Sequence, residues 1–142
     1  MTIKPQLLET LRAKRKKITQ HVKPAKLEEL HAKGVLSARE RIDALFDPST
    51  FQEVGMHAEH HAVYFGMADK KLPADGVITG SGYLGNHQVA AFCQDSSVMA
   101  GSLGKMQARK ISRVMRYAIK TGIPVVAFKD SGGARIQEGV DA

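Results

Sequence analysis

The residues best suited to chemistry lie between positions 130 and 139, in the run DSGGARIQEG. The apolar stretch PVVAF precedes them, so the pattern predicts a buried strand that passes through a double-glycine turn into a helix starting at Ile136. The first amides of a helix have no internal partner, and glycine lets a ligand approach the backbone closely. The turn therefore suits an anion or a developing oxyanion. Taken alone, the pattern also fits a phosphate site or an ordinary tight turn.

A second candidate anion site lies where Ser102, Leu103 and Gly104 open the preceding helix. Free amides at Leu103 and Gly104, with Lys105 and Arg109 behind them, would meet a phosphate. In the alternative interpretation, Ser102 is the N-cap of an ordinary helix. Both interpretations stay open from the sequence.

Other reactive side chains are less informative. His57, Glu59, His60 and His61 lie close together, but they lack the i, i+4 helical pairing and the separated third ligand of a zinc site. We therefore predict no metal. Cys93 lies in an apolar strand and is expected in the core, and a single cysteine indicates a reducing, cytoplasmic setting.

The elements that position these residues follow from hydrophobic spacing. Helices are expected at residues 5–21, 27–32 and 38–46, strands at 51–55, 75–84 and 88–94, a crossover helix after 104 and a strand at 124–128. Ser37 and Glu40 form a capping box at the third helix, and Gly85 and Asn86 make the turn of a hairpin.

The crossover helix and the strand after it predict an α/β layout. The helix carries one apolar stripe, formed by Ile111, Val114, Met115, Ala118 and Ile119, and ends at Gly122. The continuous apolar run at 124–128 is typical of a strand buried on both faces. Such a strand needs neighbours, so the sequence is expected to be cut from a longer one.

Basic residues are concentrated in two segments. Residues 1–45 hold 11 Lys and Arg against 5 Asp and Glu, and residues 105–120 hold 6 Lys and Arg with no acid. Such segments suit a nucleotide, a phosphate-bearing cofactor or RNA, or they are solvated helix faces. Lys105, Arg109 and Arg113 share one face, where solvent or a subunit interface is favoured over catalysis. The chain has neither a membrane-length apolar run nor a secretory signal pattern.

Four stretches together resemble one family. DSGGARIQEGV is similar to the carboxyltransferase (beta) subunits of biotin-dependent acyl-CoA carboxylases of the propionyl-CoA carboxylase type. LSARERIDALFDPSTFQEVG at 36–55, PADGVITGSGYLGNHQVAAFCQD at 73–95 and AGSLGKMQARKI at 100–111 resemble the same family, in its order and spacing. The resemblance covers nearly the whole chain.

The resemblance implies a crotonase-like α/β fold of the ClpP/crotonase superfamily, a ββα-type spiral that is incomplete here and preceded by N-terminal helices. Residues 1–46 would form the helical segment, and residues 47–142 the first part of the N-terminal carboxyltransferase domain. By match to the family motif, Gly132 belongs to the turn, and the amides of Gly133 and Ala134 are the candidate oxyanion donors. The resemblance also implies coenzyme A contacts at Ser102, Leu103, Gly104, Lys105 and Arg135, where Arg135 could instead form a structural ion pair.

The reaction implied is transfer of a carboxyl group from carboxybiotin to the α-carbon of a short-chain acyl-CoA, such as propionyl-CoA or acetyl-CoA. The implied partners are acyl-CoA, a biotin carboxyl carrier, a biotin carboxylase subunit and further copies in a dimer-based hexamer, with neither nucleic acid nor membrane. Biotin-dependent acyl-CoA decarboxylases and transcarboxylases share the motifs and stay open.

A basic RNA- or protein-binding domain is the alternative of another class. Such a domain is expected to carry exposed aromatic residues among its basic ones, and only Tyr117 lies in the basic helix. Residues 1–142 alone are expected to be inactive, because the second oxyanion segment of the family is not in this sequence.

Overall fold

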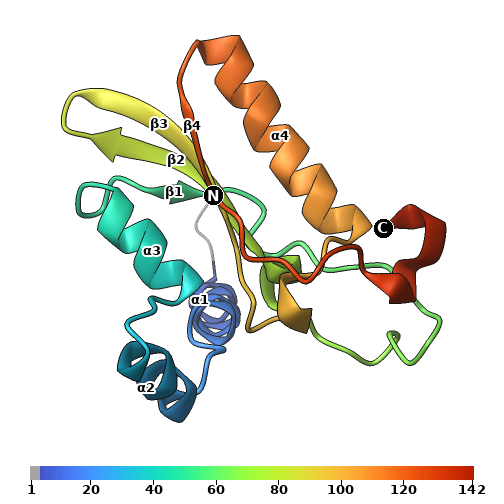
Figure 1. Cartoon of the computed structure of the whole chain (residues 1–142). Helices are drawn as coiled ribbons and strands as arrows, with labels where there is room; N and C mark the ends of the chain where they lie inside the picture. The colour runs from blue at the N-terminus through green and yellow to red at the C-terminus, as the bar shows by residue number, and fades with distance from the viewer. Residues whose placement is uncertain (1–3) are drawn as a thin grey trace.

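The computed structural model describes residues 4–142 and contains one four-stranded sheet in the order β1-β2-β3-β4. The elements in chain order are α1 (Pro5–Thr19), α2 (Pro24–Ala32), α3 (Ala38–Leu45), β1 (Gln52–Glu53), η1 (Pro73–Gly76), β2 (Val77–Leu84), β3 (His87–Gln94), η2 (Met99–Gly101), α4 (Lys105–Thr121), β4 (Val125–Phe128) and η3 (Ile136–Asp141). Figure 1 shows α3 and α4 on opposite sides of the sheet.

The hairpin and the crossover are both confirmed. β2 and β3 pair antiparallel from Val77 opposite Gln94 to Leu84 opposite His87, with the turn at Gly85 and Asn86. β4 pairs parallel to β3, so α4 makes the crossover that a parallel pair requires. α4 ends, as expected, at Gly122, which has a φ of 70°.

Alternation along the strands builds a core on each face of the sheet. On one face, Ile42 and Phe46 pack against Ile78, Ala91 and Cys93. α3 is fixed there by the expected capping box, in which Ser37 and Glu40 satisfy each other's backbone amides. Burial raises the pKa of the Cys93 thiol to about 12, consistent with a core residue.

On the opposite face, α4 packs Val114 and Ala118 against Val77, Ala90 and Phe92. Only part of the expected apolar stripe is therefore buried, since Met115 and Ile119 are exposed, Ile119 to 79%. The buried stripe of α4 instead begins with two polar residues of its first turns, Gln107 and Lys110.

Three further expectations differ from the structure. β4 is not buried on both faces: Val126 and Phe128 pack against the core on the α3 side, whereas Val125 and Ala127, on the other face, are exposed. Ile136 begins a 3₁₀ segment that bends at Gly139, rather than an α-helix. The predicted first strand is also shorter, Gln52–Glu53.

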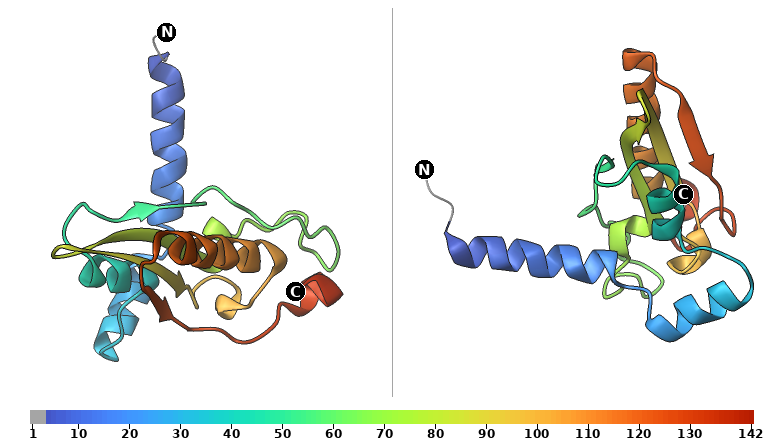
Figure 2. Two further views of the ribbon diagram at one scale, coloured as in Figure 1. Left: turned by 90° about the horizontal axis from the view of Figure 1, so that it is seen from above. Right: turned by 90° about the vertical axis from the view of Figure 1, so that its left-hand side faces the viewer.

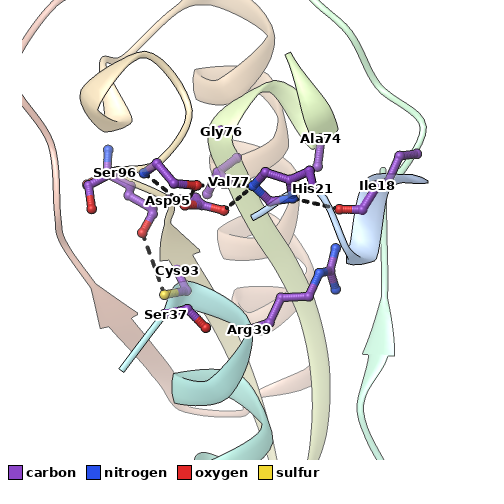
Figure 3. Close-up of polar contacts among 12 residues, drawn as sticks. Ile18, His21, Ser37, Arg39, Ala74, Gly76, Val77, Cys93, Asp95 and Ser96 are labelled. Carbon is purple, nitrogen blue, oxygen red and sulfur yellow. Dashed lines mark hydrogen bonds and ion pairs between the residues drawn. The ribbon is translucent and has the colours of Figure 1, made fainter. Parts of the chain in front are cut away.

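The helix α1 projects away from the body, as Figure 2 shows in both views, and none of its residues is buried. His21, just after α1, attaches this region to the end of β3. Its Nε2 lies 3.1 Å from Asp95 Oδ2, and its Nδ1 lies 2.8 Å from the Ile18 carbonyl (Figure 3). Nε2 also lies 3.1 Å from Ser97 Oγ. Within residues 4–142, no helix is long and apolar enough to cross a membrane.

The hydrogen bond to Asp95 raises the pKa of His21 above 6.5, although burial opposes the shift. Burial of Asp95 favours its neutral acid, but hydrogen bonds from His21 and Ser97 hold the pKa of Asp95 below its usual value. The pair is therefore charged on both sides at mildly acidic pH.

This pair predicts a pH-dependent stability. Because the folded pKa of His21 is raised, its contribution is complete below pH 6.5 and is lost as the pH rises through the folded value. The unfolding free energy of the wild type, measured by urea denaturation, should exceed that of His21→Gln most below pH 6.5. A difference that is constant with pH would contradict the charged pair. His87→Gln, at an exposed position on β3, is the control.

Candidate functional site

The double-glycine turn is held against the loop before α4 by backbone pairing. The amide of Leu103 donates to the Gly133 carbonyl, and the amide of Arg135 donates to the Leu103 carbonyl, both at 2.8 Å. This is a parallel bridge between Leu103 and Ala134. The amide of Gly132 donates to the Ala100 carbonyl at 2.8 Å. The turn is therefore anchored on both sides of Ala134.

The three candidate turn residues differ in what their amides do. Gly132 uses its amide in the backbone contact just described, and Gly133 donates to Ser131 Oγ at 3.2 Å. Ala134 donates to no group among residues 4–142. In this parallel bridge, Leu103 pairs with the residues before and after Ala134 and not with Ala134 itself. The backbone N–H of Ala134 therefore lies on the side opposite Leu103. Ala134 is exposed, and its amide is directed away from Leu103.

Arg135 is enclosed rather than exposed. Its residue surface is 1% accessible, and Nη1 lies 2.6 Å from Asp75 Oδ1 and 2.8 Å from Glu138 Oε1. Nη2 donates to the Ser102 carbonyl at 3.0 Å, and Nε lies 3.4 Å from Ser102 Oγ. The geometry of Arg135 favours the ion-pair role over a contact with coenzyme A, which stays a prediction.

Asp75 and Glu138 also cap the N-terminus of α4. The amide of Lys105 donates to Glu138 Oε2 at 2.7 Å, and the amide of Gln107 donates to Asp75 Oδ2 at 2.8 Å. Carboxylates at these orphan amides are favoured by the helix dipole. Carboxylates of the protein itself thus accept two of the amides in the first turn of α4.

At the start of α4, the structure contradicts the expected free amide of Leu103 and also the alternative in which Ser102 is the N-cap. The amide of Leu103 is not free, because the Gly133 carbonyl accepts it. Ser102 is not the N-cap, since that position belongs to Gly104. A Cβ atom on Gly104 would lie 2.5 Å from Arg135 Nη1 and 2.6 Å from Glu138 Oε1, so a side chain there would displace the ends of both residues.

Asp75 lies in an unusual turn at the beginning of β2. Both Ala74 and Asp75 have left-handed backbones, with φ of 50° and 51°, and both are buried. Two such residues in sequence are costly unless the surroundings hold them. Here Gln107 Nε2 donates to the carbonyls of Asp75 and Gly76 at 3.3 and 3.0 Å. Burial raises the pKa of the Asp75 carboxyl, and the Arg135 guanidinium opposes that shift.

Lys110 supports the same turn from α4. Its side chain is buried, and Nζ donates to the carbonyls of Ala74, at 2.6 Å, and Val77. Burial lowers the pKa of Lys110 to about 8, while Glu53 and Asp75 oppose the shift. Lys110 therefore belongs to the interior and not to a solvated basic face.

The remaining candidate residues line a cavity at the start of α4 or lie in the histidine-containing loop. A cavity of about 240 Å³ opens beside Glu138, lined by Lys105, Arg109 and Met106 of α4.

His60 Nε2 contacts the Lys70 carbonyl at 2.9 Å. Among residues 4–142, no three His, Cys, Asp or Glu side chains are grouped so that they could hold a metal ion.

Sequence reasoning missed Asp75, Gln107 and Lys110. A signal for α4 was present, since Gln107 and Lys110 continue the spacing of Val114 and Ala118 toward the N-terminus. Polar residues on a buried stripe indicate that they form hydrogen bonds with other buried groups. No comparable signal singles out Asp75, whose partner Arg135 lies 60 positions away.

Comparison with known proteins gives consistent matches. Residues 29–142 match the family model described as "Carboxyl transferase domain". The chain is 46% identical over 135 residues to methylmalonyl-CoA decarboxylase subunit alpha of Veillonella parvula, which covers 95% of this chain and 26% of that protein. It is 51% identical over 112 residues to the propionyl-CoA carboxylase beta chain of Saccharopolyspora erythraea, covering 79% of this chain and 20% of that protein.

Among solved structures, transcarboxylase 12S crystallised with methylmalonyl-coenzyme A and methylmalonic acid matches with a TM-score of 0.93 and 41% identity. The match covers 99% of this chain and 28% of that one. The chain thus spans about a quarter of the length of these relatives.

Buried Lys110 predicts a gain in stability at alkaline pH. The folded pKa of about 8 lies below the ordinary value of 10.5, so the unfolded chain holds more protons between these values. Raising the pH from 8 to 10 should therefore increase the unfolding free energy of the wild type, relative to Lys110→Met, by about 1–3 kcal/mol. Lys120→Met, at an exposed position of α4, is the control for urea denaturation. Parallel profiles for wild type and Lys110→Met would refute the shift.

Proposed function

Because this chain belongs to the carboxyl transferase domain family and has a crotonase-like fold, we propose that it supplies the thioester side of an acyl-CoA carboxyltransferase site. One observation carries the proposal. Ala134 is an exposed residue whose amide has no partner among residues 4–142, while the residues on both sides of it are anchored to Leu103. A fixed, unpaired N–H is what a developing oxyanion requires.

The amide of Ala134 would stabilise the thioester oxygen. That oxygen gains negative charge when the α-carbon of the acyl group loses a proton or a carboxyl group. One preorganised donor is worth about 3–4 kcal/mol in comparable sites. Gly133 is the second candidate donor, and its amide would exchange the Ser131 hydroxyl, 3.2 Å away, for the substrate oxygen. Gly132 holds the turn through Ala100.

We propose that coenzyme A lies along the loop at Ser102, Leu103 and Gly104, with its phosphates near Lys105. The cavity of about 240 Å³ beside Lys105 and Arg109 supports this location. Because Glu138 and Asp75 fill the first turn of α4, side chains rather than helix amides would meet the phosphates.

The acyl group proposed is short, as in propionyl-CoA or acetyl-CoA, and the carboxyl group would be supplied by carboxybiotin on a separate carrier. The unpaired amide of Ala134 suits a single carbonyl oxygen, and we assign no residue of this chain to biotin. We further propose that the enzyme works with a biotin carboxyl carrier and a biotin carboxylase subunit. It would form a hexamer and lie in the cytoplasm. The transcarboxylase 12S structure is described as a hexamer with methylmalonyl-coenzyme A, which supports the assembly and the substrate class.

Decarboxylation and transcarboxylation remain alternatives within the same chemistry. The matches include a methylmalonyl-CoA decarboxylase subunit and a methylmalonyl-CoA carboxyltransferase subunit. The thioester oxygen carries the developing charge in each of these reactions, so one donor serves all of them. A basic RNA-binding domain has less support, because Lys110 of the basic segment is buried.

The Ala134 amide can be removed without changing its side chain. Replacing Ala134 by its ester analogue L-lactate, in the assembled carboxyltransferase that carries these residues, should lower kcat about 10²- to 10³-fold. The KM for acyl-CoA should change little, because the interaction strengthens only in the transition state. The same exchange at exposed Gly66, replaced by glycolate, is the control for the ester bond. Full turnover by the Ala134 ester would reject the proposed function.

We also expect residues 1–142 alone to show no turnover of acyl-CoA with carboxybiotin. The proposal assigns them only one side of the site, and the remaining donors must come from elsewhere. Production of carboxylated acyl-CoA by the isolated chain, followed by mass spectrometry, is the measurement. Turnover at the rate of an assembled enzyme would contradict this division of the site.

A further inference from the structure

We propose that Asp75 and Arg135 are positioning residues whose buried ion pair fixes the direction in which Ala134 presents its amide. This inference rests on the proposed function, because it takes Ala134 as an oxyanion donor. It adds Asp75, which lies far from the glycine turn in sequence and whose side chain is fully buried.

The first step is that Arg135 follows Ala134 directly. The backbone pairing with Leu103 fixes the amide of Arg135 and the carbonyl of Gly133, but that pairing is a single isolated bridge. A bridge of this size has no strand on either side to stiffen it. The hydrogen bond to the Gly133 carbonyl orients the planar peptide that carries the Ala134 amide, and the hold on residue 135 must keep this short bridge in place.

The second step is that the Arg135 side chain is fixed on three sides. Its guanidinium contacts Asp75 at 2.6 Å, Glu138 at 2.8 Å and the Ser102 carbonyl at 3.0 Å, and none of its side chain is exposed. A planar guanidinium with several fixed acceptors has little freedom to rotate. Arg135 thus holds the backbone just after the proposed donor.

The third step is that Asp75 is itself held by several hydrogen bonds. One carboxylate oxygen binds Arg135 and the other accepts the Gln107 amide, while Gln107 and Lys110 hold the carbonyls of residues 74–77. Asp75 therefore joins the beginning of β2, the first turn of α4 and the glycine turn. A displacement of the donor by about 1 Å is enough to cost rate without preventing binding.

The test uses Asp75→Asn in the assembled carboxyltransferase, with kcat and KM for acyl-CoA measured per folded active site. Asn keeps the shape but removes the charge that orients Arg135. A fall in kcat of about tenfold or more, with KM changed less than about threefold, is expected. Arg135→Lys, which keeps the charge but loses the several-point contact, should give the same split and serves where Asp75→Asn does not fold.

Glu53→Gln is the matched control. Glu53 is also nearly buried and pairs with Arg39 at 2.8 Å, but it lies on β1 and is not one of the groups that bind the Arg135 guanidinium. Its loss should lower the melting temperature while kcat stays within about twofold. If Asp75→Asn and Arg135→Lys lower the melting temperature and keep kcat, the pair is merely structural and the inference is overturned.

The two proposals fail differently. If the Ala134 ester keeps full turnover, Ala134 is not a donor and the proposed function is lost. If the ester is slow while both ion-pair variants retain kcat, the proposed function stands and only the positioning role is lost.

Discussion

The ion pair between Arg135 and Asp75, 2.6 Å apart and without exposed side-chain surface, is the contact on which the rest of the site depends. A buried guanidinium is tolerated only when its charge and its donors are matched. Matching it here takes carboxylates from two segments, and both carboxylates also cap α4. The charge of one side chain therefore joins the glycine turn, a helix start and a strand start into one unit.

Much of the fold was predictable because its determinants are local. The capping box at Ser37, the turn at Gly85 and Asn86, and the left-handed Gly122 each specify a backbone conformation through neighbouring residues. The crossover helix and its parallel strand follow from hydrophobic spacing. Residues 1–46 and 47–142 as separate segments stay a prediction, and α3 shares a core with β2 and β3.

The errors arose where a local pattern depends on distant partners. The run after Ile136 has the composition of a helix, but Glu138 contributes its side chain to α4 instead. Leu103 was expected to have a free amide, yet it pairs with Gly133, 30 positions later. Asp75 gave no sign of its role, because an aspartate beside glycine is ordinary turn composition. Conversely, the glycine turn itself was visible, since its conformational demands are carried by its own residues.

The two flanks of the sheet differ in a way that fixes how it can grow. On one flank, β1 is only two residues long and gives little backbone for further pairing. On the other, β4 offers a four-residue parallel strand whose outer backbone groups lack a neighbour within the described chain. Within the described chain, a further strand would therefore find more backbone to pair with beside β4 than beside β1. If such a strand ran parallel to β4 and were joined to it by a helix, the right-handed sense of crossovers would set the face of the sheet on which that helix lies.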